Sequence, residues 1–150
     1  MKPTFDSKYQ NRFGRYHIDY HDKTLFLQLQ GACQPHLVEQ IQSALYSIIN
    51  ESSDRIWGCV IDLRQFEALT ADAMPMLLPI FRYCLNNGCV IDTYLFNNAV
   101  AKSQFHQIRQ SLGIRADITN NTFDNLHKAK RRVQLVVQAV KEKNAFVTDD

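Results

Sequence analysis

Two apolar runs, "RIWGCVIDL" (residues 55–63) and "GCVIDTYLF" (residues 88–96), decide the fold. Both are rich in β-formers and nearly unbroken in their apolar character, which is typical of central strands covered on both faces. Between them, residues 66–88 carry apolar side chains at helical spacing. A strand, a helix and a second strand in this order predict a right-handed crossover between parallel strands.

The flanking segments extend this unit. Residues 13–31 alternate between polar and apolar side chains on both sides of the turn "HDK", which predicts an antiparallel hairpin. Helical spacing predicts further helices at residues 34–51, at 98–114 and from 123 into the 140s. Pro35 suits the first turn of one of them, and Thr122 can cap the last. The segment "RADIT" (residues 115–119) is a candidate short edge strand.

These elements predict an α/β protein with a four- or five-stranded, mostly parallel sheet, an N-terminal antiparallel hairpin and about four helices. A chain of 150 residues is long enough for one domain with one core, so we expect a single domain over residues 1–150. Its ends, residues 1–12 and 144–150, are expected to be frayed.

The composition is that of an ordinary soluble globular protein, with 45% hydrophobic and 21% charged residues. The net charge of +2, with no base-stacking aromatics among the basic residues, argues against a nucleic-acid partner. No apolar run is long enough for a signal peptide or a membrane span, so the expected location is the cytoplasm. The four cysteines have no paired CxxC spacing, and at least Cys59, Cys84 and Cys89 lie among apolar neighbours. All four, including Cys33, are interpreted as small buried thiols.

Two prolines interrupt the predicted second helix. If this helix begins at Thr70, Pro75 and Pro79 each remove a backbone hydrogen bond, at about 3 kcal/mol if nothing relieves the strain. A break near Met74 would place Pro75 in a new first turn, and Pro79 would then leave a kink and an unpaired Pro75 carbonyl.

Four local patterns follow one another in a fixed order. A strand ending in a small residue, "LFLQLQG", leads into a helix, and a strand ending in Asp-Leu, "VIDLRQF", leads through a loop into the second helix. A glycine precedes the next strand in "NNGCVIDTYLF", and a later helix ends in "SLGI". In this order the patterns resemble a STAS domain, the fold of bacterial anti-sigma-factor antagonists. The resemblance runs from about Leu25 to the 130s and implies a regulatory module that binds a protein partner and is not an enzyme.

The resemblance also implies where the partner binds. The family's Asp-Ser-Ser-Gly-like turn falls on Thr70, Ala71, Asp72 and Ala73, so the serine that a partner kinase phosphorylates is missing. Asp72 is either a permanent negative charge that imitates the phosphorylated state or, in the interpretation we favour, a first-turn acid that stabilises the helix start. The expected partner surface adds Asn97 and Asn98, because open α/β sheets place their sites at the carboxyl ends of strands.

The alternative function is a carrier or sensor of a small apolar ligand or lipid. Its pocket would lie at the irregular segment containing Met74, Pro75, Met76 and Pro79, since methionine adapts to irregular surfaces. No phosphate-binding glycine loop and no nucleophile motif is present, so no cofactor is predicted. An enzyme is the third alternative and would need titratable groups that converge, for instance around Asp62 or His106.

Three further features are interpreted as surface. His17, Asp19 and His21 fall on one face of a strand but lack a clear fourth ligand, so we predict a solvated polar face and no metal site. The basic run "HKAKRRV" (residues 127–133) favours a solvated helix face over contact with an anionic membrane. The uncovered edge of the N-terminal hairpin would allow a homodimer.

Overall fold

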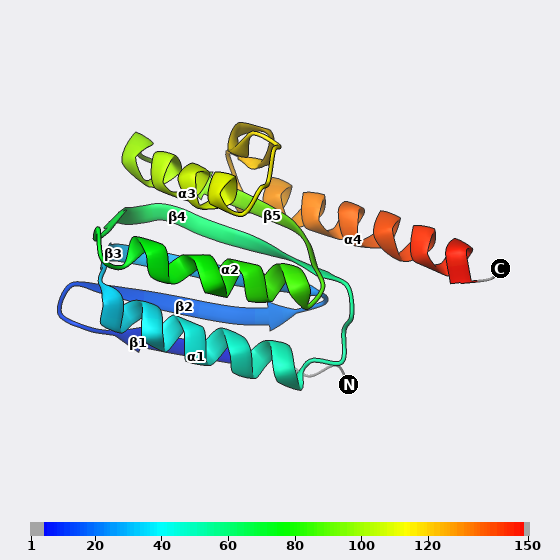
Figure 1. The fold of residues 1–150 in the computed structure, drawn as a ribbon, viewed down its shortest axis with the longest axis horizontal. Coiled ribbons are helices and arrows are strands. Elements are labelled where there is room, and N and C mark those ends of the chain that lie inside the picture. Colours follow the sequence, from blue (N-terminus) through cyan, green and yellow to red (C-terminus); the bar gives the residue numbers. More distant parts are fainter. Residues whose placement is uncertain (1–4, 149–150) are drawn as a thin grey trace.

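The computed structural model describes residues 5–148, in which a five-stranded sheet has helices on both faces (Figure 1). The strands, in their order across the sheet, are β1 (Phe5–Gln10), β2 (Gly14–His21), β3 (Thr24–Cys33), β4 (Trp57–Leu69) and β5 (Cys89–Phe96). The helices are α1 (Pro35–Glu51), α2 (Leu77–Asn86), α3 (Ala99–Ser111) and α4 (Leu126–Thr148), with 3₁₀ turns η1 (Met74–Met76) and η2 (Ile118–Asn121).

The predicted hairpin and the parallel crossover unit are confirmed. β2 pairs with β3 antiparallel around a tight turn in which Asp22 and Lys23 have positive φ, and β4 pairs in parallel with both β3 and β5. The expectation of a frayed N-terminus to residue 12 was wrong, because Phe5–Gln10 forms β1 and pairs antiparallel with β2. Two of the four pairings between described strands are therefore antiparallel, and the sheet is mixed rather than mostly parallel.

The core lies on both faces of the sheet. On one face α1, α2 and α3 pack against side chains such as Ile18, Leu29 and Leu63, and these side chains are almost completely buried. On the other face Ala129 and Val133 of α4 pack against three strands. Burial on both faces explains why the two central runs of the sequence have so few polar residues. α4 continues past the edge of the sheet, away from the other helices (Figure 1).

The prolines are accommodated without the predicted kink. The chain forms the turn η1 with Pro75 in its first positions, and α2 begins only at Leu77, not at Thr70. Pro79 is consequently the third residue of α2, where a backbone N–H would have no acceptor within the helix. The Pro75 carbonyl, predicted to be unpaired, accepts the N–H of Leu77. Each proline therefore lies in a first turn, where its missing donor costs little.

Four other features differ from the prediction. β4 continues to Leu69, where a loop was expected after Leu63, because it pairs with β3 as far as Cys33. The segment "RADIT" leads into η2, and only Thr122 makes a bridge to β5. α4 begins at Leu126, and its first turn is capped by the Asn125 side chain rather than by Thr122. The helix also continues to Thr148, where a frayed end was expected from residue 144.

Candidate partner-binding site

The residues predicted to bind a partner begin where β4 ends. The Thr70 N–H donates to the Cys33 carbonyl at the end of β3, at 3.0 Å. The Thr70 carbonyl accepts the N–H of Ala73 at 3.1 Å, which closes a tight turn. Within this turn Ala71 and Asp72 are exposed, and Ala73 is fully buried. The turn therefore presents one small and one acidic residue to solvent.

The side chains of Thr70 and Asp72 form a unit. Oγ1 of Thr70 lies 2.7 Å from Oδ1 of Asp72 and 3.4 Å from the carbonyl oxygen of Cys33, so its single proton is donated mainly to the carboxylate. Because α2 begins at Leu77, Asp72 does not occupy the first turn of α2, as both interpretations of this residue had assumed. Its carboxylate instead lies at the turn that follows β4, bonded to the Thr70 hydroxyl.

Asn97 and Asn98 follow β5 and connect α3 to β4. Oδ1 of Asn98 accepts the N–H of Ala101 at 2.7 Å, so Asn98 is the N-cap of α3. Nδ2 of Asn98 donates to the Phe66 carbonyl at 2.7 Å, and Nδ2 of Asn97 donates to the Arg64 carbonyl at 3.0 Å. Both amides therefore fix the position of the loop.

Gln104 is a residue that sequence reasoning missed. β5 ends at Phe96, opposite Leu63, so the last six residues of β4 extend beyond it. Oε1 of Gln104 accepts the Leu69 N–H at 2.8 Å, and Nε2 donates to the Leu69 carbonyl at 2.9 Å. One side-chain amide thus takes the place of a neighbouring strand. A glutamine in the middle of a helix gives no sequence signal for this role.

The two parts of the predicted surface lie on the same edge of the sheet but are not adjacent. Asn97 and Asn98 contact β4 at Arg64 and Phe66, whereas the turn begins at Thr70. At about 3.3 Å per residue, these contacts are about 20 Å and about 13 Å from the turn along the strand. A partner that contacts both parts must therefore cover a broad surface.

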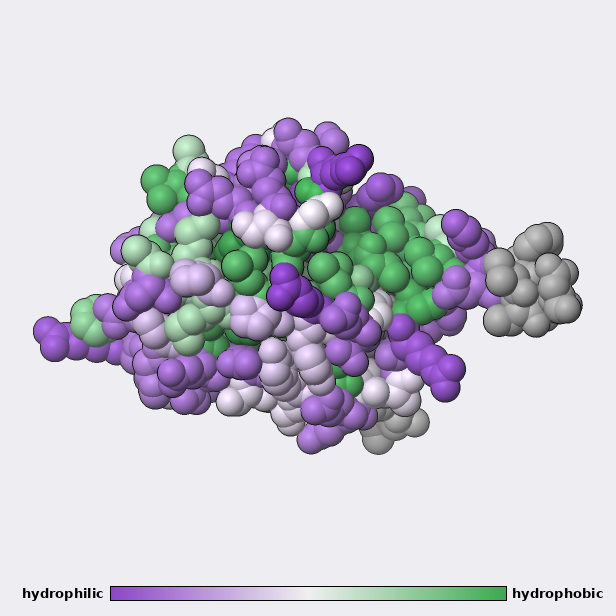
Figure 2. All heavy atoms as spheres, viewed as in Figure 1, coloured by the Kyte–Doolittle hydropathy of each residue, from purple (hydrophilic) through white to green (hydrophobic). Residues whose placement is uncertain are grey.

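A cavity of about 340 Å³ lies between the sheet, α2 and α3. Its walls are mainly leucine, isoleucine and phenylalanine side chains, among them Leu77, Ile80, Phe81 and Phe105. Figure 2 shows hydrophobic residues at the surface between α2 and α3 and over the region of β5 and α4. The predicted pocket residues Met74, Pro75, Met76 and Pro79 are not part of its lining, which begins with the first residue of α2.

The polar end of the cavity contains an ion pair between the buried Arg109 and the half-buried Asp92. Arg109, 2% exposed, donates through Nε to Oδ2 of Asp92 at 2.8 Å and through Nη1 to the carbonyl of Ala116 at 2.8 Å. The Tyr94 hydroxyl donates to Asp92 at 2.6 Å. Burial, and next the negative charge of Asp92, raise the pKa of this hydroxyl well above its usual value. The pair is neutral and well bonded, which makes the cavity suitable for uncharged molecules.

Three cysteines from three elements also line the cavity: Cys59, Cys84 and Cys89. The sulfur atoms of Cys59 and Cys89 are 3.9 Å apart. Their hydrogen bond, followed by burial, raises the pKa of Cys59, and burial raises that of Cys84. These two thiols are therefore protonated at neutral pH and contribute apolar surface to the cavity rather than nucleophiles.

The remaining candidates do not form a site in the described residues. His17 binds Asp6 at 2.9 Å, and no cluster of His, Cys, Asp or Glu within residues 5–148 has the arrangement of a metal site. Asp62 pairs with Arg64 on the face of the sheet that α4 covers, whereas His106 belongs to α3 on the opposite face.

The basic side chains at the start of α4 are exposed, and the two lysines of this run have specific contacts. Lys128 pairs with Asp124 at 3.0 Å, and the Lys130 ammonium lies over the ring of Phe26. None of the helices in residues 5–148 combines the length and the apolar character that a membrane crossing requires.

Comparisons with known proteins identify the fold. No family model and no curated protein matches the sequence. The anti-sigma factor antagonist SpoIIAA in its unphosphorylated form matches with a TM-score of 0.59 and 15% identity, over 81% of this chain and 98% of SpoIIAA. An antagonist from Mycobacterium paratuberculosis matches with a TM-score of 0.56 and 13% identity, over 79% and 92% of the two chains.

RsbS from Moorella thermoacetica, in a variant with one serine replaced by glutamate, gives a TM-score of 0.55 at 18% identity, over 85% of this chain and 99% of RsbS. At these identities the comparisons concern the fold, and they agree with the order of elements and with the paired strands described above. The chain therefore has the STAS-like fold of the anti-sigma factor antagonists.

Proposed function

We propose that this chain is a non-enzymatic, cytoplasmic regulatory module that binds a protein partner through the turn formed by Thr70, Ala71, Asp72 and Ala73. The exposed, acidic turn at the carboxyl end of β4 is the observation that carries the proposal, because open α/β sheets place their sites there. The fold of the anti-sigma factor antagonists supports it. Asn97 and Asn98 form the second, more distant part of the partner surface.

In this proposal Asp72 provides a constant negative charge. SpoIIAA, in contrast, is known in an unphosphorylated and a phosphorylated form. The turn has no serine, and its one hydroxyl, on Thr70, already donates to the Asp72 carboxylate. A phosphate on Thr70 would add about 1.5 to 2 negative charges beside that carboxylate, and the two would repel each other. The module is therefore always in its charged state and is not switched by a kinase.

The test is quantitative affinity purification from the host with the wild-type chain and two charge-reversal variants. Asp72→Lys changes the turn, and Glu142→Lys makes the same charge change at an exposed position on α4. We expect a partner that is retained by wild type and by Glu142→Lys and is lost with Asp72→Lys. A partner retained equally by all three proteins would contradict the proposed surface.

The second candidate function, a sensor or carrier of an uncharged apolar ligand, is favoured by the cavity beneath α2. Its volume of about 340 Å³ lies within the range of about 300–1,000 Å³ that is usual for ligand sites. The only charged groups of its lining, Asp92 and Arg109, neutralise each other. The cavity therefore favours apolar molecules without a charge.

A fluorescent uncharged probe, N-phenylnaphthylamine, tests this second function. Cys84→Phe would fill the cavity, whereas Leu135→Phe makes a comparable change on the exposed surface of α4. We expect probe binding by wild type and Leu135→Phe and its loss in Cys84→Phe, with an unchanged or higher melting temperature. Equal binding by the three proteins would show that the probe occupies another place.

A further inference from the structure

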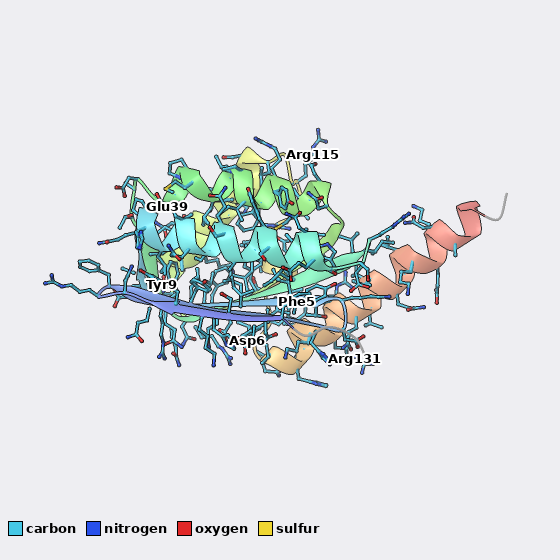
Figure 3. The ribbon with its side chains drawn as sticks, turned by 90° about the horizontal axis from the view of Figure 1, so that it is seen from below. Phe5, Asp6, Tyr9, Glu39, Arg115 and Arg131 are labelled. Carbon is cyan, nitrogen blue, oxygen red and sulfur yellow. The ribbon has the colours of Figure 1, made fainter. Side chains whose placement is uncertain are left out.

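The outer edge of β1 has no partner strand among residues 5–148. In the order of the five described strands β1 is the last on its side, and no described strand pairs with it from outside. Figure 3 shows β1 along this edge, with Phe5 and Tyr9 on the side of α1 and Asp6 on the side of α4. Such an edge offers a row of free backbone donors and acceptors to another strand.

The backbone of β1 determines which residues offer these groups. The Asn11 N–H donates to the Gly14 carbonyl at 2.9 Å, so Asn11 faces β2 at the closed end of the hairpin. Facing alternates along an antiparallel strand. The backbones of Phe5, Ser7 and Tyr9 therefore face β2, and the N–H and C=O groups that face away from β2 belong to Asp6, Lys8 and Gln10.

A second copy of β1 can pair antiparallel with the first in three registers near the middle of the strand. In each of them, residues whose backbone N–H and C=O face away from β2 lie opposite each other. Centred on Asp6, the pairing places two Asp6 carboxylates opposite each other, and centred on Lys8 it does the same with two ammonium groups. Centred on Ser7, it places Asp6 opposite the partner's Lys8 twice, by symmetry. Since like charges directly opposite are destabilising and opposite charges stabilising, charge selects the register centred on Ser7.

The other face of β1 favours the same register. There Phe5 would lie opposite the partner's Tyr9, again twice. Both rings are already ordered by contacts with β2, since Phe5 packs edge-to-face on Tyr20 and Tyr9 stacks on Tyr16. Aromatic cross-strand pairs add stability to a sheet, and ordered rings lose little freedom when they pair.

We propose that the chain forms a homodimer through antiparallel pairing of β1 with β1 of a second copy, centred on Ser7, so that the two sheets become one sheet of ten strands. In this arrangement the helices α1 of both copies lie on the same face. The strands of the two copies run in opposite directions, so the two Thr70 turns lie at opposite ends of the dimer.

Sedimentation velocity over a concentration series, with charge variants, tests the dimer. We expect wild type to reach twice the 17.4 kDa of one chain. Asp6→Lys and Lys8→Asp should each weaken association by about tenfold or more, since each creates two like-charge pairs. The double variant Asp6→Lys/Lys8→Asp should associate like wild type. A wild-type chain that stays monomeric throughout, or a double variant weaker than both single variants, would overturn the proposal.

A cysteine at the symmetry axis tests the register itself. Ser7→Cys would face its own copy in a non-hydrogen-bonded pair, at a Cα separation of about 4.5 Å that a disulfide can bridge. Gln10→Cys, exposed on the same strand, would not face itself. We expect oxidation to crosslink Ser7→Cys into dimers and to leave Gln10→Cys mostly monomeric. Equal crosslinking of both, or of neither, in an associating protein would exclude this register.

Thermal melting of each variant separates loss of pairing from loss of folding. The contact of Asp6 with His17 is exposed, so its removal should change the melting temperature little. The four native cysteines do not interfere with the crosslink, because Cys33, Cys59 and Cys89 are buried and Cys84 is half-buried.

Discussion

Beyond Leu63, β4 is no longer paired with β5, and single side-chain amides bond its backbone instead. Gln104 bonds both backbone groups of Leu69, while Asn97 and Asn98 bond carbonyls earlier in the strand. The turn at Thr70 begins one residue after Leu69, so its position depends on these amides. None of these contacts could be predicted from the sequence, since each joins residues more than 30 positions apart through a common residue type.

Replacement of Gln104 should therefore destabilise the protein. Gln104→Ala leaves the N–H and C=O of Leu69 without their partner, and we expect the free energy of unfolding to fall by about 1–3 kcal/mol in urea denaturation. Gln107→Ala, at an exposed position of the same helix, is the control and should change it by less than about 0.5 kcal/mol. Equal effects of the two changes would contradict the role given to Gln104.

Asp62 should make the free energy of unfolding fall as the pH is lowered into the acid range. Burial opposes its ionisation, but the hydrogen bonds and charge of Arg64 outweigh burial and lower its pKa below the usual 3.8. The ionised group therefore stabilises the fold above about pH 4, and this contribution is lost as pH falls through the lowered pKa. In urea denaturation the free energy of unfolding of wild type should exceed that of Asp62→Asn at neutral pH, and this difference should narrow on acidification. A constant gap between pH 7 and pH 3 would refute this assignment.

At the level of elements, apolar periodicity predicted the existence of the helices and central strands but not all of their limits. The hairpin follows its pattern, because Tyr16, Ile18 and Tyr20 all point to the core. α1 follows its pattern as well, with Leu37 and Ile41 buried. β1 was missed because Asp6, Lys8 and Gln10 make a short segment look like a polar chain end. α2 was started too early, because apolar spacing continues through η1 while the prolines shift the regular helix to Leu77.

The direction in which Pro79→Ala changes the free energy of unfolding distinguishes the observed position of Pro79 from the expected one. In the first turn of α2, proline removes no helical hydrogen bond and restricts the unfolded chain, so Pro79→Ala should lower the free energy of unfolding by about 0.4–1 kcal/mol. In the interior of a helix that began at Thr70, the same change would raise it by up to about 3 kcal/mol. Equilibrium denaturation of the variant decides between the two.

For the molecule as a whole, the order of elements from β2 onward was predictable, because the strands covered on both faces are almost entirely apolar in sequence. The position of Thr70, Ala71, Asp72 and Ala73 was inferred from the resemblance, and these residues form a turn directly after β4. The cavity could not be predicted, because its lining comes from many separate elements. Its lining combines residues from β3, α1, β4, α2, β5 and α3, which no local pattern connects.

The ion pair at the polar end of this cavity connects α3 to the sheet and should matter for global stability. Arg109→Leu would leave the half-buried Asp92 carboxylate, 15% exposed, without its partner, and we expect a loss of up to about 3 kcal/mol in the free energy of unfolding. The double variant Arg109→Leu/Asp92→Asn should recover part of this loss, because no charge stays buried. A single variant as stable as wild type would show that the pair contributes little.

β4 is one strand with two kinds of neighbour, and this difference has a kinetic consequence. From Trp57 to Leu63 it lies between two paired strands, whereas from Arg64 to Leu69 it has β3 on one side and side-chain amides on the other. Amides of the first part should exchange with deuterium only on global opening, and those of the second through smaller, local openings. The end that carries the Thr70 turn can then detach and reattach while the rest of the sheet stays closed.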